Sequence, residues 1–352
     1  MLKCKYNKKG AVSIEKLRVL SLFSGIGAFE KALSRQNIPY ELVNFCEIDK
    51  YAIKSYCAIH NVDKNLNLGD ISKVNIEKLE DFDLMTWGFC CQDISIAGKQ
   101  KGFIDANGNK TRSGLYYDGI KILKSKKPKY SIIENVKALT QKKFQKEFKQ
   151  ILNDLDDAGY NTYWKILNAK NYGILQNRER IFIISIRKDI DDKTFKFPKG
   201  FDNEVRLKDI LENNVDRKYY INEHFLNQIK NTKYKTNKIH KEDTLKLINS
   251  EFNNLLIMDY RYDEGLRIRK NNLCPTLTTG GRSSISGVPI IYDNKKLRFI
   301  TPLECWRLMG FDDEDFYKAK AAGISDAQLY KQAGNSIVVN VLEYIFKNLF
   351  LK

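Results

Sequence analysis

Four side chains of the sequence have the chemistry of a reactive site, and each lies beside a short apolar run. Cys91 follows one such run, and a thiolate is a strong nucleophile. Glu134 follows a later run and offers a carboxyl group for proton transfer. Arg178 and Arg180 stand at alternate positions, so in an extended segment both point to the same side. A cysteine alone is more often a buried structural thiol, but the four together predict nucleophilic catalysis in one crevice.

A second group of residues is suited to binding a nucleoside. The segment FSGIG (23–27) contains two glycines that let the backbone approach a ligand, and the start of the expected next helix attracts anions. Glu47 could bind ribose hydroxyls, and Asp70 could accept from an adenine amino group while Ile71 packs on the ring. The full dinucleotide glycine pattern is missing, which favours an adenine nucleoside without a pyrophosphate. Taken singly, the turn is an ordinary tight turn and each carboxylate is a solvated strand end.

The elements that must position these groups alternate between strands and helices. Apolar runs rich in β-branched and aromatic residues predict buried strands, and apolar side chains at helical spacing in 144–155 predict a helix that ends before Gly159. This alternation predicts an α/β fold with a doubly wound, mostly parallel sheet, in which ligands bind at the carboxyl ends of the strands. The predicted strands cover residues 18–23, 42–46, 82–87, 130–133 and 181–186.

The sequence divides into two expected domains. Residues 1–189 carry the strand and helix pattern. From residue 190 the chain is rich in Asn, Lys and Tyr with weak periodicity, which predicts a second, smaller and irregular domain over 190–324. Apolar side chains recur at helical spacing in 337–349, so we expect 325–352 to complete the first domain with a core-facing helix.

The charge of the chain favours a polyanionic partner. The sequence holds 60 Lys and Arg against 43 Asp and Glu, a net charge of +17. Nucleic acid is the commonest partner of such a chain, although a solvated basic surface gives the same composition. The excess is local, because residues 98–150 hold 14 basic and 4 acidic side chains, whereas residues 201–290 hold 15 and 12. The polyanion signal therefore belongs to the first domain.

Several classes of protein are excluded. A mean hydropathy of −0.46 and short apolar runs argue against a membrane protein. No apolar segment follows the lysine-rich N-terminus, so secretion is not indicated. Seven irregularly spaced cysteines and three scattered histidines fit neither a disulfide framework nor zinc spacing. We expect reduced thiols, a cytoplasmic protein and no metal site.

Nine segments occur in an order that is specific in combination. They are LFSGIGAFE (22–30), Glu47, GDI (69–71), GFCCQDISIAGKQKGF (88–103), RSGLYYD (112–118), ENVKAL (134–139), NYGILQNRER (171–180), RFITPLECWRLMGF (298–311) and QAGNS (332–336). In these segments, which span nearly the whole chain, the sequence resembles the bacterial DNA (cytosine-5)-methyltransferases. The resemblance implies a Rossmann-like fold and methyl transfer from S-adenosylmethionine to cytosine C5 in a specific site of double-stranded DNA.

The resemblance implies a role for each reactive side chain. Cys91 would add to C6 of a cytosine flipped out of the duplex, which makes C5 nucleophilic. Glu134 would hold and protonate N3, and Asn135 would fix its turn. Arg180 would contact O2, and Arg178 would orient the base or the charge around the nucleophile.

By the same resemblance, S-adenosylmethionine would lie on the glycine turn, and segments far apart in the sequence would complete its site. Ile48 occupies the position at which a large side chain often stacks on adenine. The residues expected at the cofactor are Phe23, Gly25, Ile26, Gly27, Glu47, Ile48, Asp70, Ile71, Leu115, Asn335 and Ser336.

The expected DNA contacts lie in both domains. Lysines of the loop 98–103 would hold phosphates, and the Thr276–Leu277 pair resembles the hallmark of a target-recognition domain, here 190–324. Arg267, Arg269 and Lys270 are further candidates, which plain surface charge explains equally well. The expected DNA-binding residues are Ser95, Lys99, Gln100, Lys101, Arg112, Thr276, Leu277 and Arg282.

Two positions depart from the pattern of the family. Cys90 replaces a proline before the nucleophile, which loosens the turn that aims Cys91. Ala97 replaces a loop serine of some relatives, which we expect to be tolerated. The leading hypothesis is a monomeric enzyme of a restriction-modification or phage-defence system, with a possible cognate restriction endonuclease. A tRNA methyltransferase is the alternative within this chemistry, although the size of the variable domain favours DNA. A DNA-binding protein without activity is the third hypothesis, because of Cys90.

Overall fold

The chain forms two compact units in the computed structural model. The structure describes residues 4–6, 12–14, 16–94, 100–202, 204–232, 242, 244–247, 249, 254–282 and 284–351. The first unit comprises residues 1–167, 179–199 and 341–352, and the second comprises 168–178 and 200–340. Segments 168–178 and 325–340, which we expected in the first domain, thus belong to the second unit, and residues 190–199, which we expected in the second domain, belong to the first unit.

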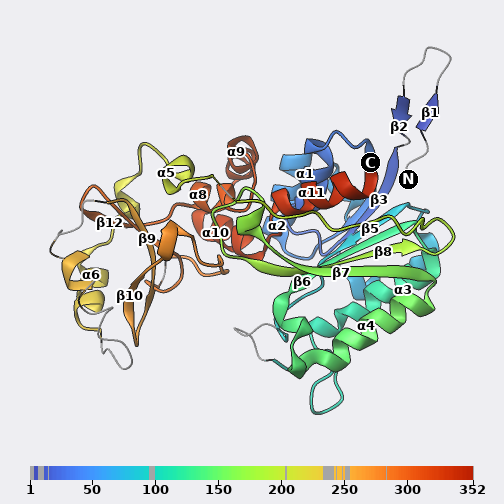
Figure 1. The fold of residues 1–352 in the computed structure, drawn as a ribbon, viewed down its shortest axis with the longest axis horizontal. Coiled ribbons are helices and arrows are strands. Elements are labelled where there is room, and N and C mark those ends of the chain that lie inside the picture. Colours follow the sequence, from blue (N-terminus) through green and yellow to red (C-terminus); the bar gives the residue numbers. More distant parts are fainter. Residues whose placement is uncertain are drawn as a thin grey trace. The chain divides into compact units, whose positions relative to one another are not determined.

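A six-stranded sheet forms the centre of the first unit, with strand order β4-β3-β5-β6-β8-β7 (Figure 1). Strands β3 to β6 pair in parallel, and β8 runs antiparallel to β6, which confirms the mostly parallel sheet. The sequence did not reveal β7, because this edge strand is half exposed and lacks an apolar run. The strands are β3 (Leu17–Leu22), β4 (Tyr40–Cys46), β5 (Leu84–Trp87), β6 (Tyr130–Val136), β7 (Tyr160–Asn168) and β8 (Glu179–Arg187), and a separate hairpin is formed by β1 (Cys4–Tyr6) and β2 (Val12–Ile14).

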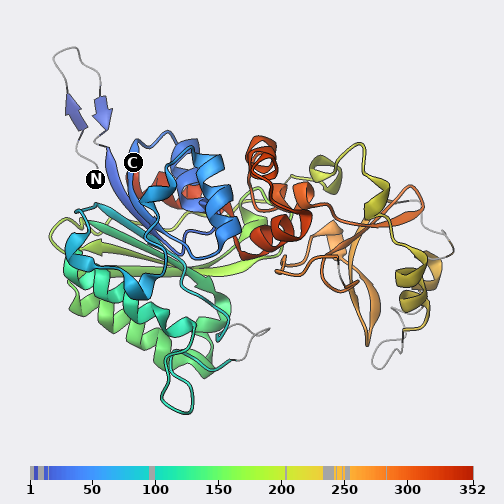
Figure 2. The same ribbon diagram turned by 180° about the vertical axis from the view of Figure 1, so that it is seen from behind.

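Helices cover both faces of this sheet, as a doubly wound fold requires (Figures 1 and 2). Leu20 and Leu22 pack with Trp87, Ile120 and Ile151 in one apolar cluster beneath α3 and α4. Because successive residues of a strand point to opposite faces of the sheet, the side chain of Ser21, between these two leucines, points to the other face. The helices are α1 (Ala28–Arg35), α2 (Lys50–His60), α3 (Tyr116–Lys126), α4 (Gln145–Asp157) and α11 (Val339–Phe350).

The last helix completes the first unit, as its apolar spacing predicted. Phe346 is fully buried, and its ring centroid lies 6.5 Å from that of Phe29 on α1. Phe350 meets the ring of Tyr130 edge-on at 5.1 Å. Residues from the start and the middle of the unit therefore share one apolar core with the C-terminal residues of the chain.

The second unit contains a four-stranded antiparallel sheet with order β10-β9-β11-β12, which the sequence did not predict. Its strands are only four to six residues long, too short for a clear period. Arg298 and Glu304, both at most 2% exposed, form a two-pronged ion pair that fixes β12 to α8. The elements are β9 (Leu256–Arg261), β10 (Gly265–Ile268), β11 (Ile290–Asp293), β12 (Lys296–Phe299), α5 (Leu207–Ile210), α6 (Glu223–Lys230), α8 (Pro302–Arg307), α9 (Asp313–Ala321) and α10 (Asp326–Asn335).

None of the helices formed by the described residues has the length and apolar character needed to cross a membrane.

A carboxyl group lies buried between α1 and the sheet. Glu30 is 1% exposed, and burial raises its pKa above the usual value of 4.5. The hydroxyls of Ser21 and Tyr56 lie beside it and lower this pKa by less than burial raises it. Folding therefore favours the protonated form of Glu30.

The buried acid predicts a pH dependence of stability. Because the pKa of Glu30 is higher in the folded chain, its contribution to stability is full below the unfolded pKa and is lost as the pH rises through the folded pKa. Glu30→Gln removes this loss, so the variant should gain stability relative to the wild type as the pH rises from about 5 to about 8. Urea unfolding at several pH values measures this difference. Glu41→Gln, at an exposed position, is the control. Parallel curves for the wild type and Glu30→Gln would contradict the buried neutral acid.

Candidate active site

The turn that carries Cys91 is held by hydrogen bonds on both sides of Cys90. Asn135 Nδ2 donates to the carbonyl oxygen of Phe89 at 3.0 Å, and the backbone N–H of Ile94 donates to the carbonyl oxygen of Cys91 at the same distance. Cys91 itself is half-buried. These bonds fix the backbone without the proline that the family resemblance led us to expect at position 90.

An aromatic cluster anchors the same turn to the core. Phe89 is 2% exposed, and its ring meets those of Phe103 and Tyr116 edge-on at 5.6 and 5.5 Å. Tyr116 in turn stacks on Trp87 at the end of β5, with centroids 5.7 Å apart. Both ends of the segment 88–103 are thereby tied to one rigid group of rings.

The thiol of Cys90 lies in surroundings that disfavour its ionised form. Burial raises the pKa of the Cys90 thiol above 9.0, and the carboxylates of Asp93 and Glu47 raise it further, while Arg112 and a backbone hydrogen bond lower it. Cys90 is therefore protonated at neutral pH, which makes it a poor nucleophile. The assignment of the reactive thiol to Cys91 stays the prediction of the sequence motif.

Glu134 and Arg180 form a pair on neighbouring strands. The register of β6 with β8 places Arg180 opposite Val136, and hence diagonal to Glu134 on the same face. Arg180 Nε lies 3.1 Å from Glu134 Oε1, and Glu134 is 8% exposed. Because β5 and β6 are parallel neighbours, Glu134 near the end of β6 and Cys91 beyond the end of β5 lie toward the same edge of the sheet.

Arg178 has different surroundings from Arg180. Strand β8 begins at Glu179, so Arg178 precedes the strand and belongs to the second unit. The Arg178 side chain is 3% exposed and donates to the carbonyl oxygens of Leu277, Gly334 and Ser336 at 2.8 to 3.0 Å. These contacts join three segments of the second unit, and the expected contact of Arg178 with a base stays a prediction.

The glycine turn is closed by the carboxylate of Glu47. The backbone N–H of Gly25 donates to Glu47 Oε2 at 2.9 Å, and the N–H groups of Ile48 and Asp49 donate to Oε1 at 2.8 Å. Burial raises the pKa of Glu47, and these three hydrogen bonds offset part of that rise. Glu47 is thus held between the turn and the start of α2.

Asn67 is a further residue of this region that sequence reasoning missed. Its side-chain oxygen accepts from the N–H of Glu47 at 3.1 Å, and its Nδ2 donates to the Glu47 carbonyl at 3.0 Å. The same oxygen accepts from the N–H of Gly69. An asparagine two residues before a glycine was a possible signal, because its amide readily bonds backbone groups nearby.

Other expected cofactor residues of the first unit follow Glu47 in the sequence. Ile48 is 72% exposed, an unusual state for a large apolar side chain. Asp70 caps the short helix Ile71–Lys73 and accepts from the Ser72 N–H and hydroxyl, which lowers its pKa. Ile71 is buried, and Leu115 is partly buried at the end of the short helix Ser113–Leu115.

Asn335 and Ser336 belong to the second unit. Asn335 is exposed at the end of α10, and Ser336 is buried as the C-cap of that helix, with its hydroxyl donating to the Ile337 carbonyl at 3.2 Å. Their expected closure of the cofactor site stays a prediction.

The basic loop is described in part. Ser95, Ala97 and Lys99 lie outside the described residues. Gln100 accepts from Lys143 Nζ at 2.6 Å, and Lys101 is exposed. Arg112, also exposed, donates to Gln92 Oε1 at 2.8 Å, so it borders the turn of the nucleophile.

The Thr–Leu segment of the second unit depends on a buried glutamine that the sequence analysis did not single out. Gln176 is fully buried, its Oε1 accepts from the N–H of Leu277 at 3.0 Å, and its Nε2 donates to the carbonyl of Leu308 at 2.9 Å. Thr276 is exposed, and its hydroxyl donates to the Asn177 carbonyl at 2.6 Å. Gln176 stands two residues before Arg178, so the motif that pointed to the arginines contained it.

The other arginine candidates of the second unit have partners. Arg267 pairs with Asp259 and with Glu264, and Arg269 pairs with Asp259. The Arg282 guanidinium lies over the ring of Tyr219, 4.6 Å from its centroid. Nothing is described of the side chain of Lys270.

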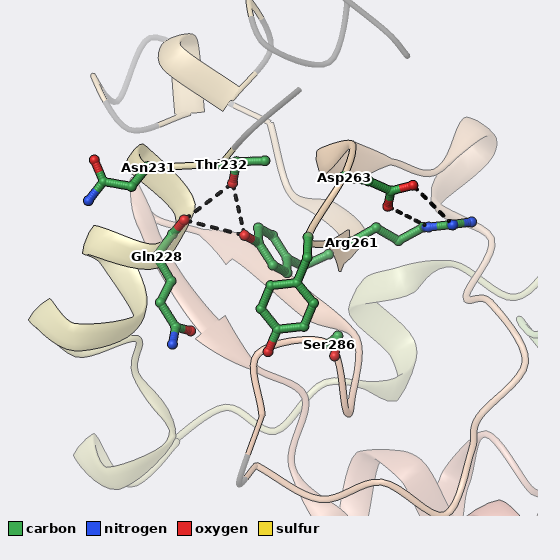
Figure 3. A pocket seen from close by; sticks show the side chains of 8 residues that line it. Gln228, Asn231, Thr232, Arg261, Asp263 and Ser286 are labelled. Carbon is green, nitrogen blue, oxygen red and sulfur yellow. Dashed lines mark hydrogen bonds and ion pairs between the residues drawn. The ribbon is translucent and has the colours of Figure 1, made fainter. Parts of the chain in front are cut away.

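A separate hollow of about 740 Å³ lies in the second unit (Figure 3). Its polar groups bond one another: Arg261 pairs with Asp263 at 3.1 Å, and the Tyr260 hydroxyl lies 2.8 Å from the Thr232 hydroxyl. Its lining contains an acid and an arginine but no thiol, so among the described residues the carboxyl ends of β5 and β6 are the better candidate for nucleophilic chemistry.

The chain is similar to known proteins of one kind along nearly its whole length. The family model for C-5 cytosine-specific DNA methylases matches residues 17–351. The orphan methyltransferase M.SPRI of Bacillus phage SPR is 37% identical, over 95% of this chain and 97% of the relative. The type II methyltransferase M.HhaI of Haemophilus parahaemolyticus is 34% identical, over 95% and 94%.

Solved structures share the fold. The S. pombe Dnmt2 methyltransferase aligns with a TM-score of 0.67 at 22% identity, over 96% of this chain and 98% of that chain. A putative DNA modification methyltransferase encoded in an E. coli prophage aligns with a TM-score of 0.64 at 23% identity, over 96% and 99%. The predicted fold class, an α/β sheet with a smaller second domain, is confirmed.

Replacing the buried Gln176 tests the support of the Thr–Leu segment. Gln176→Leu keeps similar volume but leaves the Leu277 N–H and the Leu308 carbonyl without partners, which should lower the free energy of unfolding by roughly 2–4 kcal/mol. Urea unfolding measures the change, with the exposed Lys208→Ala as the control. A change below about 0.5 kcal/mol, the range of ordinary surface substitutions, would show that these two bonds carry no weight.

Proposed function

The chain belongs to the C-5 cytosine-specific DNA methylase family, and we propose that it methylates cytosine C5 by covalent catalysis from Cys91. The observation that carries this mechanism is the Glu134–Arg180 pair, formed between the end of β6 and the start of β8, with β6 next to the strand whose turn presents Cys91. A carboxyl group and a guanidinium side by side match the N3 and O2 edge of a cytosine. The thiol stands at the neighbouring strand end, where the C6 atom of that base would lie.

The first step overcomes the low nucleophilicity of cytosine C5. The Cys91 sulfur forms a bond to C6, the electron pair of the C5–C6 double bond is released toward the ring, and N3 takes a proton from Glu134. The product is an enamine whose C5 is nucleophilic. Arg180 donates to O2 and keeps the Glu134 carboxyl in place, which stabilises the charge that develops on the ring.

The later steps restore the aromatic ring. S-adenosylmethionine supplies the methyl group that C5 receives. The C5 proton is then lost to water, its bonding pair re-forms the C5–C6 double bond, the bond between Cys91 and C6 breaks to release the thiolate, and N3 returns its proton to Glu134. The hydrogen bonds to the carbonyls of Phe89 and Cys91 fix the backbone that carries the sulfur for both its attack and its departure.

The residues of the glycine turn fit S-adenosylmethionine. A side-chain atom at Gly25 would meet nothing within 4 Å, so the turn is open to a ligand. Ile48 offers an exposed apolar surface for the adenine ring, and the Glu47 carboxylate has further lone pairs for ribose hydroxyls. Phe23, Ile26 and Gly27 of the turn, Asp70, Ile71 and Leu115 complete the proposed set, with Asn335 and Ser336 from the second unit.

We propose duplex DNA as the substrate, with the target cytosine flipped out at a cost of roughly a few kcal/mol. The exposed Lys101 and Arg112 would bind phosphates near the turn of Cys91, together with Gln100, Ser95 and Lys99. Thr276, Leu277 and Arg282 would contact the target sequence from the second unit. The likeness to the S. pombe protein is one of fold and gives no argument for an RNA substrate.

The relatives suggest the setting in which this enzyme works. M.SPRI is named an orphan methyltransferase and M.HhaI a type II methyltransferase. We propose a monomer that acts in phage defence or in a restriction-modification system, where a cognate endonuclease would share its site. The described residues Cys46, Cys57, Cys274 and Cys305 are not joined in disulfides, which agrees with the cytoplasmic location that we propose.

Covalent trapping tests the mechanism. On DNA that contains 5-fluorocytosine the C5 substituent cannot leave as a proton, so the wild type with S-adenosylmethionine should form a complex that survives denaturant. Cys91→Ala should form none, whereas the matched variant Cys90→Ala should still be trapped, and mass spectrometry of ordinary DNA should show 5-methylcytosine. Trapping by Cys91→Ala but not by Cys90→Ala would overturn the assignment, and methylation without trapping would overturn the covalent step.

The phosphate contacts predict a strong salt dependence. DNA affinity should fall steeply with salt, and Lys101→Ala should reduce the slope of log K against log salt by about 1, because one phosphate contact is lost. Fluorescence anisotropy at several salt concentrations measures the slope. Lys188→Ala, an exposed lysine paired with Asp156, should leave it unchanged. An unchanged slope for Lys101→Ala would remove this residue from the DNA interface.

A further inference from the structure

The glycine turn holds an unusual concentration of left-handed backbone. Phe23, Gly25 and Gly27 have φ values of 54°, 56° and 81°. A left-handed phenylalanine is costly, and such conformations persist only where the surroundings fix them. The Glu47 carboxylate holds the Gly25 N–H, and the Gly27 N–H donates to the Ser24 carbonyl at 2.9 Å, but neither bond reaches the carbonyl of Ile26. This part of the turn has a further support.

His60, the last residue of α2, supplies this support. Its Nε2 lies 3.1 Å from the carbonyl oxygen of Ile26. Because a carbonyl only accepts, Nε2 carries the proton and donates. A β-carbon placed on Gly27 would lie 2.0 Å from the same nitrogen, so the imidazole fills the space directly against the glycine. One ring thus bonds the backbone of the turn and forms the wall behind it.

Aromatic rings of α2 and β4 hold the His60 imidazole in place. The ring of Tyr56, one turn earlier on α2, lies 4.8 Å from that of His60. Tyr56 is fully buried and stacks on Phe45 of β4, with centroids 4.3 Å apart and planes 17° from parallel. The orientation of His60 therefore depends on a rigid stack that begins in the sheet.

Helix α2 connects the His60 ring to Glu47 and Ile48, two other residues of the proposed cofactor site. Its N-cap is Asp49, which accepts from the N–H of Tyr51 at 2.9 Å, and Glu47 and Ile48 come directly before it. The start of α2 thus follows the groups proposed for the ribose and adenine, and its end presses on the glycine turn. A shift of the helix would move both together.

We propose that His60 is a positioning residue for S-adenosylmethionine: by donating to Ile26 and packing on Gly27, it sets the shape of the turn that binds the cofactor. The inference rests on the proposed cofactor site. It assigns His60 no contact with substrate. A histidine that served only core packing would contribute to stability but not to the affinity of the folded protein for the cofactor.

The first experiment separates these two roles. Titration calorimetry with S-adenosylhomocysteine should give a Kd about tenfold higher for His60→Ala, the effect of losing one hydrogen bond of typical strength. His60→Gln, whose amide can place a donor near the position of Nε2, should restore most of the affinity. Lys54→Ala, on an exposed face of the same helix, is the control. A lower Tm of His60→Ala with an unchanged Kd would overturn the proposal.

A double variant gives a test with a change of sign. Gly27→Ala should weaken binding, because its new methyl group meets the imidazole and the left-handed φ is strained. Adding His60→Ala removes the clash with the imidazole but not the backbone strain. The double variant should therefore bind S-adenosylhomocysteine several-fold more tightly than Gly27→Ala, although His60→Ala alone weakens binding. Additive losses would show that the ring and the turn do not act together. A wild type that binds no S-adenosylhomocysteine would instead overturn the proposed cofactor, and the two failures are distinct.

Discussion

The parallel pairing of β5 with β6 is the constraint on which the reactive groups depend. Hydrogen bonds between backbones fix Trp87 beside Ile133, so the chain leaves both strands at one edge. The thiol follows the end of β5 and the acid lies within the last residues of β6, so both are positioned on or next to the sheet. The antiparallel addition of β8 then brings in Arg180 from the opposite direction. Three groups from three distant segments are thus placed by backbone geometry alone.

In each of the two units, side chains restrict irregular backbone by hydrogen bonds. Asn135, Asn67 and Gln176 each use an amide to hold two or three backbone groups at a turn or segment of the expected site. Arg178 does the same with a guanidinium. A neutral amide can satisfy a donor and an acceptor at once, which explains its use where irregular backbone is buried. The replacement of a proline by Cys90 is compatible with this arrangement, because neighbouring bonds already restrict the turn.

The sequence predicted the strands and helices that have a clear local apolar pattern. It did not predict the elements and side-chain roles that depend on tertiary contacts. The five core strands, α4 and α11 follow from apolar spacing, since each buries one face or both. Strand β7 and the hairpins of the second unit were missed because half-exposed or short strands leave no clear period. Family motifs pointed to Arg178 and Arg180 together, but only the structure shows that one pairs with Glu134 and the other bonds carbonyls of the second unit. His60 had no local signal at all, because its partner lies 34 residues away in the sequence.

The path of the chain through its two units has a consequence for biosynthesis. Helix α11 follows the whole second unit in the sequence, and it covers Phe29 and Tyr130, which are translated long before it. While the second unit is being translated, these rings lack their final cover, and the first unit cannot reach its complete core. The nascent enzyme must therefore keep an apolar face soluble until α11 has been made, so a chain cut before α11 would have an unfinished core.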